Sequence, residues 1–383
     1  MRTGPAVLAL LLASGPARTE EAPPAAALVR DPAVREASGL AVARRRTETL
    51  WSHNDSGYTP DLHAVSFDGD YLGAVRVEGA ENVDWEDLAA FEHEGRPFLL
   101  IGDVGDNQAR RREVSLIAAP EPGWMEDGRP EPKVRPAWTV RFRYPDGPRD
   151  AESVAVDGER GQVLILSKRD RVPRLYAVPL RPEDPDRLHT ATFLGESRGL
   201  PRPAGLNLAA RIAAQPTAMD FTPDGQSLVV LTYGDAFRFQ WREGDRSWAD
   251  PLAREPERIP LPSPALGILP QREGLAVDAE GRTVFVISEG TPAQMLRVPL
   301  PSDPDPSSEP SSGTANEPSA ALRRNPLDHR GHRGYGGSQR GAVGWQIILD
   351  PAVDGHAYAQ AASEQQLAHE NGRTQWVRAE EWP

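Results

Sequence analysis

The stretch E-G-L-A-V-D-A-E-G-R-T-V-F-V-I-S-E, from Glu273 to Glu289, decides the fold, because the chain repeats its pattern five times. An apolar segment, Leu275–Val277, leads into a polar turn that contains Gly281, and a second apolar segment, Val284–Ile287, follows. Two such segments joined by a Gly-containing turn predict a β-hairpin. A single small sheet cannot bury both of its faces, so we expect the copies to pack against one another.

The five copies are spaced 48 to 66 residues apart. They begin at Ser38, Glu86, Glu152, Thr217 and Glu273, and their second strands are followed, 15 to 17 residues later, by His53, Asp103, Lys168, Tyr233 and Glu289. A third strand is expected in most copies, over Leu62–Phe67, Ser115–Ala118, Leu175–Leu180 and Met295–Leu300. Repeated antiparallel meanders of this length predict an all-β fold, a β-propeller.

The number of blades follows from the copies that are visible. Five copies fill residues 36–300, and the stretch Leu28–Val34 could supply an outer strand that closes the ring. A sixth blade is the alternative, and it would have to come from the C-terminal tail, where Trp345–Leu349 is the only convincing strand. The sequence therefore predicts five blades and leaves six open.

Composition favours the all-β fold and excludes several functions. The 383 residues include 34 Gly and 38 Pro, which is typical of many short elements joined by turns. The net charge of −13 argues against a nucleic-acid partner, because phosphate binding needs a basic face. The absence of cysteine excludes disulfides, zinc–thiolate sites and thiol catalysis.

The N-terminus is typical of an exported bacterial protein. Arg2 precedes an apolar run, Ala6–Ala13, and small residues follow it up to Ala17. The run is too short to span a bilayer, which takes about 20 residues. We expect a signal peptide over 1–17, cleaved near Ala17, and a periplasmic or secreted protein that acts as a monomer. The propeller would occupy 18–300, a low-complexity disordered linker 301–343, and a tail of unknown structure 344–383.

Acidic residues recur at one place in the repeat. Because residues two apart on a strand share a side, Asp84 with Glu86 and Asp150 with Glu152 form acidic pairs where the first strands begin. A hairpin returns its second strand to the same end of the blade. If the first strands are innermost, all these groups converge on one mouth of a central channel.

Converging carboxylates repel each other unless a cation neutralises them, and Ca²⁺ accepts six to eight oxygen ligands. The loops 53–57 and 102–107 carry further acid and amide oxygens. The candidate ligands are Glu36, Asn54, Asp55, Asp84, Glu86, Asp103, Asp106, Asn107, Asp150 and Glu152. The alternative is that these acids cap strand ends or pair with nearby arginines.

Basic residues on the same rim indicate an anionic substrate. The candidates are Arg110, Arg149, Lys168, Arg169 and Arg272. Arginine binds phosphate or carboxylate oxygens through two parallel hydrogen bonds. Simple balancing of the acidic charges would explain these residues equally well. Glu86, Glu152 and Glu273 are the candidate general bases.

The motifs as a set resemble a largely uncharacterised family of secreted bacterial β-propellers. They are S-G-L-A (38–41), H-N-D-S-G (53–57), D-W-E-D-L-A (84–89), G-D-V-G-D-N (102–107), Y-P-D-G-P-R-D-A-E (144–152), T-Y-G-D-A-F (232–237) and S-E-G (288–290). More distantly the chain is similar to phytase-like propellers and to calcium-dependent lactonase and esterase propellers, which implies a calcium-supported hydrolase. It lacks the D-A-x-D-D-P-A signature of propeller phytases, which argues against phytate hydrolysis.

Two functions follow as expectations. The first is a calcium-dependent hydrolase of an anionic ester, phosphoester or lactone. The second is a non-enzymatic binding or scaffold propeller in which calcium only stiffens the loops. Because propellers host many unrelated functions, the fold does not choose between them.

Overall fold

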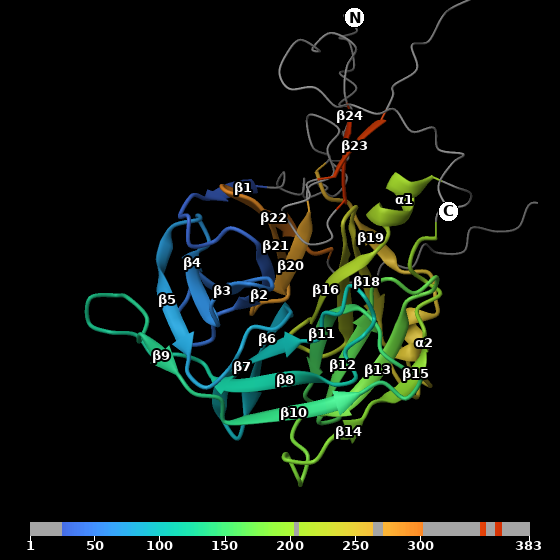
Figure 1. The fold of residues 1–383 in the computed structure, drawn as a ribbon, viewed down its shortest axis with the longest axis horizontal. Coiled ribbons are helices and arrows are strands. Elements are labelled where there is room, and N and C mark those ends of the chain that lie inside the picture. Colours follow the sequence, from blue (N-terminus) through green and yellow to red (C-terminus); the bar gives the residue numbers. More distant parts are fainter. Residues whose placement is uncertain (1–24, 203–206, 263–270, 302–344, 350–356, 362–383) are drawn as a thin grey trace, which may run out of the picture.

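The computed structural model describes residues 25–202, 207–262, 271–301, 345–349 and 357–361. The predicted signal peptide, nearly all of the predicted linker and most of the predicted tail lie outside these residues. Five small antiparallel sheets surround a common centre, as Figure 1 shows. The predicted all-β propeller is confirmed, and it has five blades.

Each blade is a meander of four main strands. The inner strands are β2 (Ala37–Val42), β6 (Trp85–His93), β11 (Ala151–Asp157), β16 (Pro216–Phe221) and β20 (Arg272–Val277). The second strands are β3 (Thr49–Asn54), β7 (Arg96–Asp103), β12 (Gln162–Ser167), β17 (Ser227–Thr232) and β21 (Thr283–Ser288). The third strands are β4 (Asp61–Ser66), β8 (Val114–Pro120), β13 (Arg174–Pro179), β18 (Ala236–Gln240) and β22 (Ala293–Pro299).

The outer strands complete the blades and close the ring. They are β5 (Tyr71–Val77), β10 (Trp138–Arg143), β15 (Thr192–Glu196), β19 (Glu257–Ile259) and β1 (Ala25–Val29). A closing strand exists and pairs antiparallel with β22 in blade 5, but it runs over Ala25–Val29, so only Leu28 and Val29 of the predicted stretch belong to it. Two-residue strands, β9 (Lys133–Val134) and β14 (His189–Thr190), add parallel edges to blades 1 and 2.

The core is divided into five hydrophobic clusters, one between each pair of neighbouring blades. Each forms because the inner three strands of a blade are apolar on both faces, as in the fully buried central part of β12. The inner strand β2 packs against both β6 and β20, so the first and the last blade are neighbours. The ring is therefore closed by five blades.

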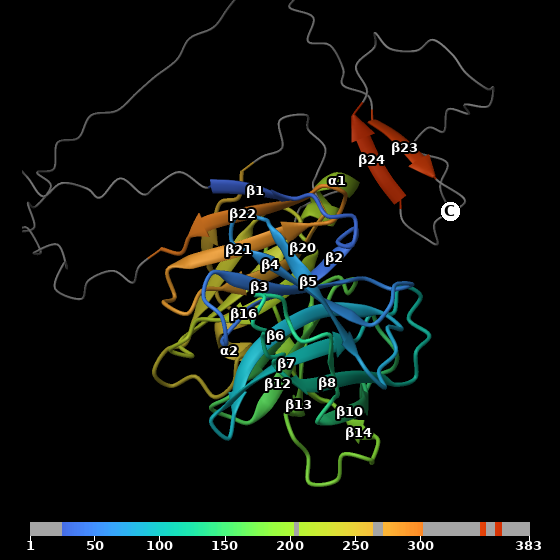
Figure 2. The ribbon, with the colours of Figure 1, turned by 90° about the vertical axis from the view of Figure 1, so that its left-hand side faces the viewer.

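The remaining described elements lie outside the ring. The helices α1 (Leu208–Ala213) and α2 (Ala249–Leu252) belong to connections around blade 4 (Figure 1). The predicted strand Trp345–Leu349 is β23, and it pairs only with β24 (Ala357–Ala361) in a separate two-stranded sheet (Figure 2). It builds no sixth blade. None of the helices within the described part of the chain has the length and apolar character needed to span a membrane.

Candidate functional site

A β-bulge at the start of every inner strand positions the candidate site. The pairing of inner and second strands skips one residue in four blades and two residues in blade 1. The skipped residues are the first of each sequence copy, namely Ser38 with Gly39, Glu86, Glu152, Thr217 and Glu273. A bulge bends the strand and redirects the side chain of the extra residue, so the same local feature orients the skipped residues in all five blades.

The bulge explains why the acidic side chains of Asp84, Glu86, Asp150 and Glu152 lie close together, and this explanation differs from the one that the sequence predicts. Simple alternation predicts that Asp84 and Glu86 lie two positions apart on one strand. In the structure Asp84 and Asp150 precede β6 and β11, and the bulged glutamates Glu86 and Glu152 stand beside them. Convergence therefore comes from the strand entry and the bulge together, and not from regular pleating.

The structure brings five of the ten predicted ligands together. Oxygen atoms of Asp55, Asp84 and Glu86 all lie within 4.8 Å of one another, and we call this group the first triple. Oxygen atoms of Glu86, Asp150 and Glu152 do the same and form the second triple. Apart from Asp84, which is partly exposed, these carboxylates are buried. Three blades thus contribute to one acidic cluster joined through Glu86.

Mutual repulsion and burial act on this cluster. Burial, and then the neighbouring Asp55, raises the pKa of Asp84 to about 7. Burial also raises the pKa of Glu86 well above its usual range, and the charges of Glu152, Asp55 and Asp84 add to this rise. Among the residues that the structure describes, no basic side chain forms an ion pair with Asp84 or Glu86. The positive charge that acts on Asp84 comes from the nearby Arg111, which lowers its pKa without forming an ion pair with it.

The loop 102–107 presses against the first triple through Gly105. A Cβ atom at this position would lie 2.1 Å from Oε1 of Glu86 and 2.6 Å from Oδ2 of Asp84. Only glycine allows so close an approach of the backbone. The predicted ligands Asp103 and Asp106 in the same loop have other partners. Asp103 pairs with Arg111 at 2.8 Å, and Asp106 accepts hydrogen bonds from the backbone amides of Arg110 and Arg111.

Three more predicted ligands lie around the cluster. The Asn54 amide oxygen accepts hydrogen bonds from the backbone amides of Arg35 and Glu36, and its amino group donates to the carbonyl of Ala33. This side chain therefore fastens the entry to β2. The Asn107 amide oxygen accepts a hydrogen bond from Arg169. The carboxylate of Glu36 stands near Tyr58, whose pKa rises through burial and then through that charge.

The second triple already carries positive charge from the protein. Arg169 Nε donates to Asp150 Oδ2 at 2.6 Å, and the buried Lys168 forms an ion pair with Glu152. The Lys168 ammonium also donates to the Tyr233 hydroxyl at 2.7 Å. That hydroxyl donates in turn to Glu273 Oε1 at 2.7 Å. Burial opposes the charge of Lys168, but Glu152 and Glu273 outweigh it and raise its pKa well above the usual range.

The other predicted substrate-binding arginines have different surroundings. Arg272 is buried and donates to the backbone carbonyls of Tyr233, Gly234 and Pro262. Arg149 pairs with Asp146 and Asp170, and its guanidinium lies over the rings of Tyr144 and Tyr176. Arg110 is exposed on the rim. Of the five predicted groups, Arg110 and the half-exposed Arg169 reach the solvent.

Two members of the site have no assigned role in the sequence prediction. Tyr233 joins Lys168 to Glu273 through two hydrogen bonds. In the sequence, only its position just after a second strand indicates that it belongs to the site. Glu289 occupies the same repeat position in blade 5. Burial, and then the charges of Glu273, Asp55 and Glu36, raises its pKa to about 9. The recurrence of polar residues after each second strand is the signal that points to both.

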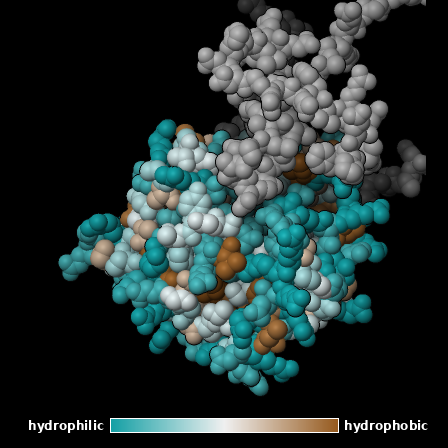
Figure 3. All heavy atoms as spheres, in the orientation of Figure 1, coloured by the Kyte–Doolittle hydropathy of each residue, from teal (hydrophilic) through white to brown (hydrophobic). Residues whose placement is uncertain are grey.

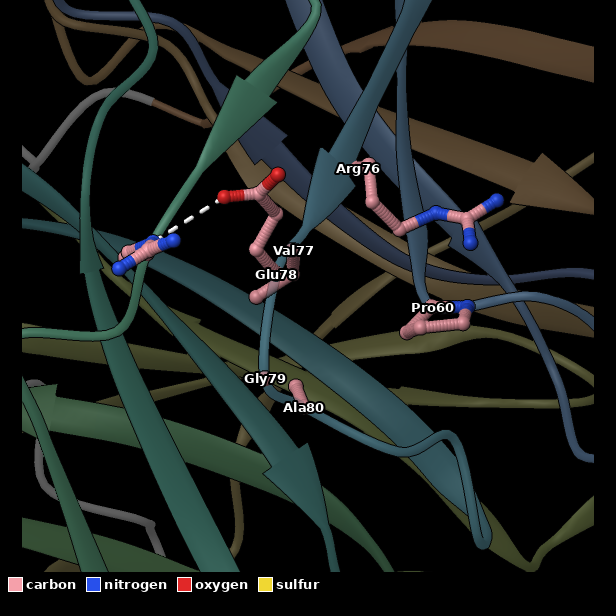
Figure 4. Close-up of a pocket in the computed structure, with 7 residues that line it drawn as sticks. Pro60, Arg76, Val77, Glu78, Gly79 and Ala80 are labelled. Atoms are coloured by element: carbon pink, nitrogen blue, oxygen red, sulfur yellow. Dashed lines mark hydrogen bonds and ion pairs between the residues drawn. The ribbon is translucent and has the colours of Figure 1, made fainter.

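One surface hollow lies away from the acidic cluster. An open hollow of about 510 Å³ is lined by the outer edge of blade 1 and by Arg135 (Figure 4). Its charged groups are already paired, because Glu78 binds Arg135 and Lys133, and Arg76 binds Asp61. The face drawn in Figure 3 is mostly hydrophilic, with hydrophobic residues in small separate patches. The acidic cluster is therefore the best-supported candidate site.

Comparisons with known proteins add little about function. No family model matches the chain, and no curated protein matches it. It is similar to a crystal structure of a candidate 6-phosphogluconolactonase from Bacteroides uniformis, with a TM-score of 0.33 and 12% identity over 71% of this chain and 68% of that one. A match this distant carries no argument about activity. The family resemblance drawn from the motifs stays a prediction.

Proposed function

We propose that the acidic cluster binds one Ca²⁺ at the first triple, and that the protein is an exported hydrolase of an anionic ester, phosphoester or lactone. The observation that carries the cation site is the meeting of Asp55, Asp84 and Glu86 oxygens within 4.8 Å of one another. Two ligands on opposite sides of a calcium ion, each about 2.4 Å away, are separated by about this distance.

The donor set suits a hard cation. All members of the first triple offer carboxylate oxygens, which calcium prefers over the nitrogen and sulfur ligands of zinc or copper. A cation would also offset the burial, and after it the mutual repulsion, that raises the pKa of Asp84 and Glu86. The contact of Gly105 with both carboxylates holds them in place from the loop side.

The chemistry would use the charge of the cation and the nearby protein groups. A bound calcium ion polarises a substrate oxygen and lowers the pKa of water. Glu86 is the candidate general base, because its carboxylate belongs to the first triple and would lie beside the cation. Arg110 on the rim would hold the anionic group of the substrate, and Arg169, which already binds Asp150 and Asn107, would add its remaining donors.

A second function is favoured because several basic side chains of the site bind other groups of the protein. Arg149, Arg272 and Lys168 all bind oxygens of the protein itself, so they are less suited to substrate binding than the sequence predicts. A propeller that binds a ligand without catalysis, and holds calcium only for rigidity, agrees with this arrangement. Cation binding and catalysis therefore require separate experiments, because the second function needs the first property without the second.

Cation binding is tested by calorimetry on metal-stripped protein. We expect Glu86→Gln and Gly105→Ala to weaken calcium binding about tenfold or more, equal to about 1.4 kcal/mol, because one removes a ligand charge and the other displaces two ligands. Gly158→Ala is the matched control, since its Cβ would meet open space. Unchanged affinity in both variants would contradict the site.

Catalysis is tested with a panel of esters, phosphodiesters and lactones. We expect activity that a chelator abolishes, that calcium restores, and that Glu86→Gln lowers while Gly158→Ala leaves it intact. A protein that binds calcium normally but hydrolyses nothing in the panel would support the non-enzymatic function instead.

A further inference from the structure

Lysine is rare in this chain, and one of the few copies is buried in the site. The sequence holds 43 Lys and Arg residues, of which only Lys133 and Lys168 are lysines. Lys133 is exposed on β9 and pairs with Glu78 at the edge of blade 1. Lys168 is buried, with its side chain 5% exposed. A chain that uses arginine almost everywhere has kept a compact ammonium at this one buried position.

The surroundings of Lys168 are those of a bound cation. Its ammonium pairs with Glu152, donates to the Tyr233 hydroxyl at 2.7 Å, and interacts with the charges of Glu273 and Glu86. The two contacting oxygens come from blades 3 and 4, and the charges of Glu273 and Glu86 act on the ammonium from blades 5 and 2. Coordination by converging oxygens is also how proteins hold calcium or magnesium.

The two triples differ in how their charge is neutralised. The second triple receives Arg169 at Asp150 and Lys168 at Glu152. In the first triple, no basic side chain of the described residues forms an ion pair with Asp84 or Glu86, although the charge of Arg111 acts on Asp84 and that of Lys168 on Glu86. Because Glu86 belongs to both, the two triples are neighbouring cation positions within one cluster.

We propose that Lys168 is a built-in counter-cation that occupies a second cation position, so that the cluster takes one divalent ion and not two. This inference rests on the proposed function, since it requires calcium at the first triple. Lysine suits the position better than arginine, because its ammonium is a compact point charge with three donors, whereas a guanidinium is planar and larger. Removing the ammonium would leave Glu152, Glu273 and Glu86 available to a second ion.

The experiment compares calcium stoichiometry in wild type, Lys168→Met and Lys133→Met. Methionine keeps the length of the side chain and removes the charge, and Lys133 is the matched control because it is the only other lysine. Calorimetry and native mass spectrometry should count one ion in wild type and in Lys133→Met, and two in Lys168→Met. Without calcium Lys168→Met should melt below wild type, and calcium should raise its melting temperature by more than it raises that of wild type.

A second variant separates the proposed role from simple loss of stability. In Lys168→Met combined with Glu273→Gln one ligand of the new position is also gone, so the count should return to one. If Lys168→Met folds only with calcium, native mass spectrometry counts the ions on the folded fraction.

The outcomes separate this inference from the proposed function. One ion in both wild type and Lys168→Met, with Lys168→Met merely less stable, would make Lys168 an ordinary structural residue and overturn the inference alone. Two ions in wild type would overturn it as well. No calcium in wild type would remove the proposed function and the inference with it.

Discussion

At the scale of single residues, the site is defined by carboxylates that the fold buries close to one another, although burial and mutual repulsion both disfavour their ionised form. Asp84 is the clearest case, because burial and the charge of Asp55 raise its pKa to about 7, whereas an unfolded aspartate ionises near 4. Between these values the folded protein binds a proton that the unfolded chain has released. Stability must therefore fall as the pH rises through this window.

This gives a pH prediction for the calcium-free protein. Below about pH 4 Asp84 is protonated in both states, and above about pH 7 it is ionised in both, so its contribution is lost between these limits as the pH rises. We expect urea unfolding in the presence of a chelator to show lower stability at pH 7.5 than at pH 5. Asp84→Asn should reduce this difference, and an identical pH dependence in the variant would show that Asp84 is not its source.

At the scale of elements, the inner strands are joined by side chains that bond to the backbone of the next blade. The buried carboxylate of Asp87 accepts hydrogen bonds from the amides of Leu88, Val154 and Met219, which belong to β6, β11 and β16. In the same way Asp220 in β16 accepts the amide of Val277 in β20. Asp87 thereby links the inner strands β6 and β11, at whose starts four of the five carboxylates of the acidic cluster lie, and Asp220 links β16 to β20.

Asp87→Ala tests this linkage. It would leave three buried amides without their acceptor, each costing about 1–3 kcal/mol, so we expect the free energy of unfolding to drop by about 3 kcal/mol or more. Urea denaturation measures the change, and Glu280→Ala in an exposed turn serves as control. A loss below about 1 kcal/mol would mean that Asp87 does not fasten the blades.

At the scale of the whole molecule, the sequence predicts the architecture better than it predicts the site. Five copies of one hairpin pattern are enough for the fold, because each copy is locally complete and packs mainly on its two neighbours. The closing strand is also predictable, although its start is not, since pairing with β22 extends β1 back to Ala25.

The site is predicted in part, for a physical reason. The repeated register identifies Asp84, Glu86, Asp150 and Glu152, because identical positions in neighbouring blades must lie around one centre. The roles of Asn54 and Asp106 are not predictable, since loop side chains can bind their own backbone as readily as an ion. The alternation of side chains along a strand does not predict the bulges, because alternation assumes a regular pleat.

The central claim is that a divalent cation binds at the first triple. The most direct measurement is a crystal structure of the protein with calcium, or with terbium in its place, in which anomalous scattering locates the ion. We expect one peak bound by Asp55, Asp84 and Glu86, with the Lys168 ammonium still paired with Glu152. A peak elsewhere, or no peak in well-ordered crystals at millimolar calcium, would contradict the account.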